Sequence, residues 1–102
     1  MTAVKEGDVF IMKHPDRDEE SKSFYFIENV WGQELCDVLV ITFWKHTIPT
    51  MYFISGYVSD ILAPPARGSR EQGTSSDWFM ALQSMFVQVR EYSKKVIEKA
   101  KE

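Results

Sequence analysis

The sequence has few of the features that mark a secreted or membrane protein. Its 102 residues include one cysteine, Cys36, so no internal disulfide can form, whereas small secreted domains usually depend on several. No apolar run approaches the roughly 20 residues that a membrane-spanning helix needs, and residues 1–8 lack the apolar core of a secretory signal. We therefore expect a cytoplasmic protein with no membrane partner.

Motifs of common enzymes and cofactor sites are also missing. The 5 glycines are scattered, so neither a GxGxxG nor a GxxxxGK phosphate loop occurs, and no CxxC, HxxxH or HExxH metal spacing is present. Cys36 could act as a nucleophile only with His14 or His46 as its base, and a small buried hydrophobic residue is the interpretation that we favour. We expect no catalytic residue, no metal and no cofactor, and hence no enzyme.

An excess of positive charge is absent too. The formal net charge is -3 and the pI is about 5.4, which disfavours nucleic acid as a partner. Residues 1–62 hold 5 Lys and Arg against 10 Asp and Glu, while residues 63–102 hold 7 against 5. The acidic first part favours a partner protein that has a basic surface.

The chain does contain enough apolar sequence for a core. Apolar residues make up 44% and charged residues 26%, as is typical of folded globular proteins. Two separate cores would each be too small at this length, so we expect one domain over residues 1–102. Aromatic residues reach 14%, which is more ring surface than a core of this size is expected to enclose. Some rings are therefore candidates for contact with a partner.

Short apolar segments predict a sheet in residues 1–62. Four runs rich in aromatic and β-branched residues have the length of strands, namely 9–12, 24–30, 38–43 and 51–54. The continuous apolar run 38–43 is expected to be the central strand. Residues 57–62 fit the spacing of a strand and of a helical turn, and we predict a fifth short strand there.

Alternation within the second predicted strand assigns its side chains to two faces. Successive residues of a strand point to opposite sides of the sheet. Phe24, Phe26 and Glu28 are therefore expected on one face, and Asn29 on the other.

Residues 63–76 differ sharply in composition from what precedes them. They contain Pro64, Pro65, Gly68 and Gly73 but no large apolar side chain, which predicts a flexible loop.

The last residues have helical periodicity. Apolar side chains recur every three or four residues, which predicts an amphipathic helix over 77–102, capped by Ser75 or Ser76. The apolar positions are Trp78, Leu82, Met85, Val89, Tyr92, Val96 and Ala100. The predicted fold class is α+β: a small antiparallel sheet or SH3-like, partly open barrel of four to five strands, followed by one long C-terminal amphipathic helix.

Three kinds of residue are candidates for partner contact. Large rings often anchor protein interfaces, with a core position as the alternative for each, and the candidates are Trp31, Trp44, Trp78 and Phe79. An acidic run could form a contact surface or a solvated loop, and comprises Asp16, Asp18, Glu19 and Glu20. Two arginines of the predicted loop, Arg67 and Arg70, could bind phosphate groups.

Residues 4–10, Val-Lys-Glu-Gly-Asp-Val-Phe, resemble the start of the MazF and PemK toxin family. The resemblance implies a small SH3-like barrel with a C-terminal helix and an RNA-cutting activity. In that family an Arg-Pro pair leads the next strand and supplies the catalytic arginine, whereas here Ser21-Lys22-Ser23 precede Phe24. The catalytic arginine therefore has no counterpart at this position.

We interpret the chain as a small non-catalytic protein-binding module, of the inhibitor or immunity type, that masks a target through an acidic, aromatic-rich surface. One alternative is a nucleic-acid-binding SH3-like barrel or a MazF/PemK-like toxin ribonuclease that uses Arg67 and Arg70 with stacking aromatics. A second alternative is a homodimeric interaction protein that self-associates through the apolar start of the C-terminal helix.

Overall fold

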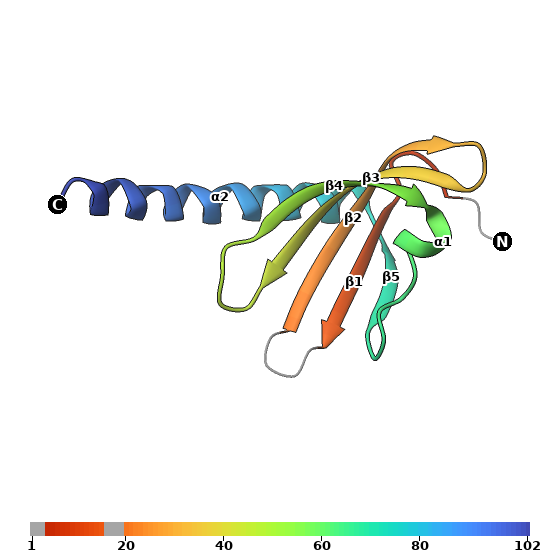
Figure 1. Ribbon diagram of the computed structural model, residues 1–102, viewed down its shortest axis with the longest axis horizontal. Helices are drawn as coiled ribbons and strands as arrows, with labels where there is room; N and C mark the ends of the chain where they lie inside the picture. The colour runs from red at the N-terminus through yellow and green to blue at the C-terminus, as the bar shows by residue number, and fades with distance from the viewer. Residues whose placement is uncertain (1–3, 16–19) are drawn as a thin grey trace.

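The computed structural model describes residues 4–15 and 20–102 of the chain (Figure 1). Within these residues the elements are β1 (Val9–Pro15), β2 (Glu20–Trp31), β3 (Leu35–Trp44), β4 (Thr50–Tyr57), α1 (Val58–Ile61), β5 (Ser69–Gly73) and α2 (Ser75–Ala100). The strands form one open antiparallel sheet in the order β4-β3-β2-β1-β5. This arrangement confirms the predicted α+β class with a small antiparallel sheet and one long C-terminal helix.

The sheet is apolar on both faces. One face, which we call the helix face, packs against α2 and includes Val9, Phe24, Phe26, Leu39 and Ile41. The opposite face, which we call the inner face, includes Met12, Tyr25, Ile27, Val38 and Val40. Because both faces of β3 are covered, its sequence is a continuous apolar run instead of an alternating one.

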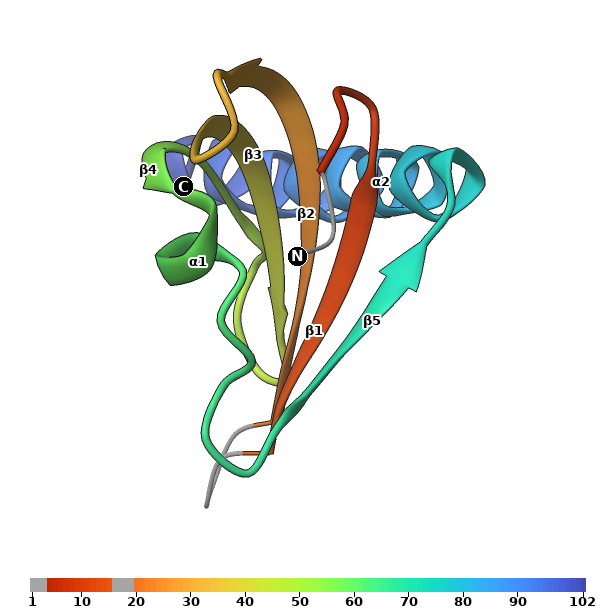
Figure 2. The same cartoon turned by 90° about the vertical axis from the view of Figure 1, so that its right-hand side faces the viewer.

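The inner face is covered by α1 and the residue that follows it. Ile61 and Leu62 follow Val58 by three and four residues, so all three side chains project onto the inner-face core. Figure 2 shows the chain after α1 passing beneath the sheet to reach β5 at the far edge. There the Arg70 guanidinium donates a hydrogen bond to the Leu62 carbonyl and lies 5.9 Å from the centre of the Phe10 ring. This contact ties β5 to the end of α1.

The long helix α2 begins with a capping box. The Asp77 amide donates to the Thr74 hydroxyl at 3.2 Å, and the Thr74 amide donates to the Asp77 carboxylate at 2.7 Å. The cap is therefore Thr74, in place of the predicted Ser75 or Ser76. The helix packs across β1, β2 and β3, and its last turns project past the β4 edge (Figure 1). None of the helices in the described part of the chain is long and apolar enough to span a membrane.

The predicted fifth strand at residues 57–62 is wrong, because these residues form the end of β4 and α1. The ladder ends where Tyr57 pairs with Leu35, and the next amide, that of Val58, donates to the Glu34 carbonyl at 2.7 Å. A helical turn then directs neighbouring apolar side chains to the same side, which an alternating strand cannot do.

The fifth strand lies instead within the segment predicted to be a loop. Ser69–Gly73 pairs with β1, with Lys13 opposite Ser69 and Val9 opposite Gly73. Its side chains are polar and almost all exposed, so no apolar pattern marks it in the sequence. Because β5 lies on this edge, β2 is the middle strand and the prediction that 38–43 is central is wrong.

Adjacent rings on α2 provide a test of this packing. Trp78 is 8% exposed and stacks on Phe26 with ring centres 5.2 Å apart, whereas Phe79 is 60% exposed. We expect Trp78→Ala to lower the free energy of unfolding by about 3–5 kcal/mol and Phe79→Ala by less than about 1 kcal/mol. Urea denaturation followed by circular dichroism measures both, and equal losses would contradict the packing described.

Candidate functional site

A row of exposed apolar side chains crosses one end of the helix face. Trp31 on β2 lies opposite Leu35 on β3, which in turn lies opposite Tyr57 on β4. Their exposed fractions are 57%, 41% and 54%, so the row is open to solvent. We call these three residues the aromatic platform.

A polar row lies beside the platform and is centred on one carboxylate. Asp37 lies opposite Asn29 on one side and Ser55 on the other. It accepts hydrogen bonds from the Ser55 hydroxyl, from the Trp31 indole Nε1 at 2.9 Å and from the Asn29 amide Nδ2 at 3.3 Å. The bond from Ser55, followed by that from Trp31, holds the pKa of the Asp37 carboxyl below its usual value. Asp37 is therefore a charged acceptor that fixes the orientation of the Trp31 indole.

The platform exists because β2 carries a bulge. The register against β3 shifts between Ile27, opposite Val38, and Asn29, opposite Asp37. The extra residue, Glu28, reverses the alternation beyond it, so Asn29 lies on the helix face and its predicted placement on the opposite face is wrong. Without the bulge Trp31 would point to the inner face, because regular alternation puts it on the opposite side from Phe26.

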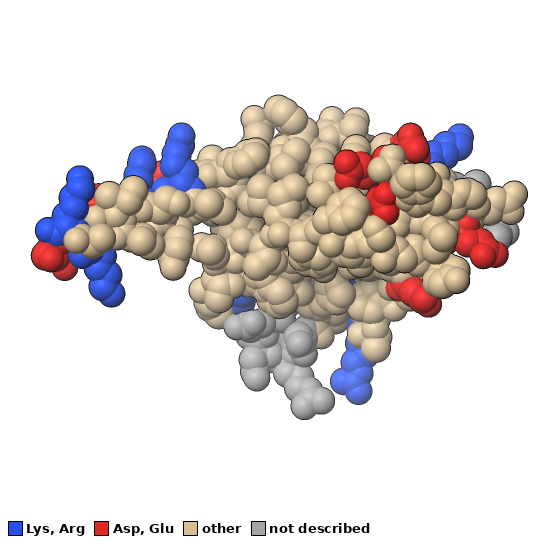
Figure 3. Space-filling model, turned by 45° about the horizontal axis from the view of Figure 1, so that its top comes forward, with Lys and Arg blue, Asp and Glu red and all other residues tan. Residues whose placement is uncertain are grey.

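The platform lies at the acidic end of the molecule. Glu28 at the bulge and Glu34 in the turn between β2 and β3 are both exposed beside it. Figure 3 shows most of the visible Asp and Glu side chains at the end of the molecule away from the C-terminus of α2, whereas several Lys or Arg side chains gather near that C-terminus. A broad uncharged surface separates the two groups. The charge asymmetry between the two parts of the sequence is thus also an asymmetry in space.

The four predicted aromatic anchors do not come together. Trp31 belongs to the platform, and Phe79 is exposed on the first turns of α2. Trp78 is a core residue against Phe26. Trp44 is exposed at the far end of β3, where its indole Nε1 donates to the Thr50 hydroxyl at 3.4 Å.

The acidic run is only partly described. Asp16, Asp18 and Glu19 lie outside the described residues, and Glu20 is described only as the first residue of β2.

An open pocket of about 730 Å³ lies at the end of the sheet opposite the platform. Cationic side chains from two strands and two connecting segments line it, together with rings of β3. The residues used below are Lys13, Lys22, Lys45, Arg67, Phe43 and Trp44. Lys13 lies opposite Lys22 in the ladder, and Lys13 also forms an ion pair with Glu71 at 4.0 Å. We call this the cationic pocket.

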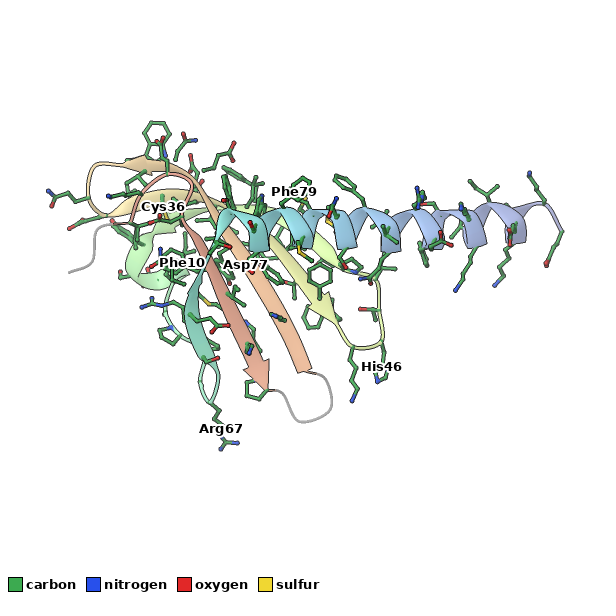
Figure 4. All side chains as sticks on the ribbon, turned by 180° about the vertical axis from the view of Figure 1, so that it is seen from behind. Phe10, Cys36, His46, Arg67, Asp77 and Phe79 are labelled. Atoms are coloured by element: carbon green, nitrogen blue, oxygen red, sulfur yellow. The ribbon has the colours of Figure 1, made fainter. Side chains whose placement is uncertain are left out.

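The two predicted phosphate-binding arginines are separated. Arg67 lines the cationic pocket and projects from the turn before β5, as Figure 4 shows. Arg70 is directed to Phe10 and the Leu62 carbonyl instead. The next residue after Arg67 is Gly68, where a Cβ would collide with the Lys13 carbonyl oxygen, so only glycine allows this close approach.

Sequence reasoning missed the lysines of the pocket. Lys13 and Lys22 were not singled out because they are isolated charges, nine residues apart in the sequence, and only strand pairing brings them together. A hairpin alignment of β1 with β2 would have placed them side by side.

Cys36 lies in the inner-face core, where burial, followed by the nearby Asp37 charge, raises the pKa of its thiol. Figure 4 shows Cys36 and His46 at opposite ends of the sheet. His14, which pairs with Ser21, lies at the same end as His46. Among residues 4–15 and 20–102 no three His, Cys, Asp or Glu side chains are grouped as metal ligands.

Comparison of the chain with protein-family models, with curated proteins and with solved structures finds no match.

The Asp37 hydrogen bonds predict an acid-dependent loss of stability. The pKa of Asp37 is lower in the folded chain than its ordinary value of 3.8. The ionised carboxylate therefore makes its full contribution to the free energy of unfolding when the pH is above 3.8. The contribution is lost as the pH falls through the folded pKa. We expect Asp37→Asn to be less stable than the unmodified chain at pH 7, with the difference vanishing in acid.

Urea denaturation of both chains from about pH 7 to about pH 3 measures this difference. A difference that stays constant over that range would contradict the described role of the carboxylate.

Proposed function

We propose that the chain is a non-catalytic protein-binding module that masks a target protein through the aromatic platform. The observation that supports this proposal is an exposed row of Trp31, Leu35 and Tyr57 beside a carboxylate that fixes the indole. Tryptophan and tyrosine are enriched among the residues that dominate binding energy at protein interfaces. An inhibitor or immunity-type protein is the kind of module that we infer.

The hydrogen bond to Asp37 prepares Trp31 for binding. A side chain that is already held in one orientation loses less conformational entropy when a partner covers it. The indole N–H already has an acceptor within the chain, so a partner that covers the platform does not leave this donor without a hydrogen bond.

The charges around the platform indicate the chemistry of the target. Glu28 and Glu34 are exposed beside it, and Asp37 is ionised at neutral pH, since its pKa lies below the ordinary value of 3.8. Acidic groups around an apolar centre accelerate association with a basic surface and disfavour acidic partners. We therefore propose a target with an apolar pocket surrounded by Lys or Arg.

Substitution at the two exposed tryptophans tests the proposal. The tagged chain is used to capture its target from a nuclease-treated lysate of its host, and the dissociation constant is then measured by calorimetry. We expect Trp31→Ala to weaken binding at least about thirtyfold, the loss typical of an interface anchor. Trp44→Ala, at the opposite end of β3, is the matched control and should leave binding within about twofold.

A basic target whose affinity falls with Trp31→Ala and with added salt would support the proposal. Retention of full affinity by Trp31→Ala, or equal losses from both substitutions, would show that the platform is not the binding site.

The cationic pocket favours a second candidate function, the binding of single-stranded nucleic acid. Lys22, Lys45 and Arg67 could contact phosphates while Trp44 stacks on a base, a combination typical of single-strand binding. The acidic net charge counts against it.

Titration with single-stranded RNA at about 50 mM salt tests this candidate, because phosphate contacts are strongest at low salt. We expect Lys22→Ala and Arg67→Ala to weaken any binding severalfold and Trp31→Ala to leave it unchanged. Absence of binding under these conditions would remove the candidate.

A further inference from the structure

The apolar stripe of α2 continues beyond the part of the helix that packs on the sheet. Its first members are buried against the helix face: Trp78, Ala81 and Met85. Steps of three or four residues return to the same side of a helix. Val89, Tyr92 and Val96 therefore lie on that side as well, yet they are 37%, 50% and 48% exposed. We call residues 89–100, which extend past the β4 edge, the arm.

The edge strand beside the arm is also open. Among the described residues β4 pairs with β3 alone. Its sequence, Thr50–Tyr57, contains no charged residue and no proline, although edge strands that must stay single usually carry such residues. Met51 and Phe53 lie opposite Ile41 and Leu39, so they extend the helix face, and both are exposed.

We infer that a second copy of the chain covers both surfaces. In this two-fold dimer β4 pairs antiparallel with the partner's β4, and the arm of each chain lies over the edge of the partner's helix face. An antiparallel pair of identical strands is related by a two-fold axis, which is the symmetry that a closed dimer requires. The arm points its apolar stripe toward the plane in which the partner's sheet would continue.

The dimensions of the arm fit this arrangement. Twelve helical residues, 89–100, are about 18 Å long at 1.5 Å per residue. Adjacent strands are about 4.8 Å apart, so the arm is long enough to cross roughly three strands of a continued sheet. The described part of its own chain has no strand there (Figure 1).

The apolar area is sufficient for a moderate dimer interface. Seven large apolar side chains of β4, the arm and the helical turn before it are about half exposed: Met51, Phe53, Phe86, Val89, Tyr92, Val96 and Ile97. Together they offer on the order of 600 Å² per chain, before the paired backbone is counted, against about 800 Å² in a standard interface.

Charge favours a second copy over a contact between two arms. Residues 86–102 hold 5 Lys and Arg against 3 Asp and Glu, whereas residues 1–62 hold 5 against 10. A basic arm over an acidic sheet is attractive, while two arms packed on each other would bring like charges together. This interface differs from the start of the helix, where the sequence predicted self-association, because Trp78 and Ala81 are buried within the chain.

The inference does not depend on the proposed function. The dimer uses the outer edge of β4 and the arm, whereas the platform is centred on Trp31 and Leu35 of the β2–β3 hairpin. A chain that dimerises but binds no target, or that binds a target as a monomer, would separate the two proposals.

A pair of identical substitutions on opposite sides of α2 tests the dimer. Val96 lies on the apolar stripe, and Val87 is nine residues away, two and a half helical turns, and so faces the other side. Both valines are exposed, and Val→Glu at either position adds the same charge. Circular dichroism confirms that each variant is folded.

Sedimentation equilibrium of the full chain from about 1 to about 100 µM measures the dissociation constant. We expect a dimer of twice the 11.9 kDa chain mass, a dissociation constant raised about tenfold or more by Val96→Glu, and a change within about twofold for Val87→Glu. A monomer over the whole range, an open series of larger oligomers, or equal effects of the two substitutions would overturn the inference.

Hydrogen exchange at two protein concentrations tests the strand pairing. We expect the amides of β4 to exchange more slowly at the higher concentration, and Phe53→Lys, which adds a charge at the edge, to remove that difference. A dimer in which β4 exchange does not depend on concentration would contradict the pairing of the two edges.

Discussion

The fold depends on one constraint, which is that β1, β2 and β3 are apolar on both faces and each face must be covered. α1 with Leu62 covers the inner face, and the first turns of α2 cover the helix face. Because β5 lies at the edge opposite β4, α2 starts there and has to cross the sheet before it can end. The helix therefore covers the middle strands but leaves the Trp31 end of the helix face and the edge strand β4 exposed.

Patterns that reflect burial could be predicted from the sequence, and patterns set by pairing could not. The four apolar strands and the amphipathic helix follow from β propensity and from helical spacing. β5 was missed because a polar edge strand is held by backbone bonds to β1 and has no apolar face of its own. The sequence of residues 57–62 fits both the spacing of a strand and that of a helical turn. The structure has the helical turn α1, because that turn directs its apolar side chains together onto the inner face.

The candidate sites could be predicted in part for the same reason. Trp31 was identified because the chain has more aromatic side chains than a core of its size is expected to enclose. Its partner Asp37 and its neighbour Tyr57 come from other strands and are brought to it only by the strand register. The cationic pocket likewise assembles single charges from separate elements. The two sites lie at opposite ends of the sheet and share β2 and β3, so these two strands present an acidic aromatic surface at one end and a basic concave one at the other.

The bulge in β2 gives one residue a role that its chemistry does not reveal. Glu28 is exposed, and its side chain forms no hydrogen bond or ion pair among those found in the described residues. The bulge lets β2 hold one residue more than β3 does over the same stretch, so Asn29 and Trp31 stay opposite Asp37 and Leu35. If Glu28 instead took a regular place in the ladder, every later position up to the hairpin turn would change face, and the indole would lie on the inner face, where Val30 now packs. The backbone at this position therefore matters, while its side chain is free to vary.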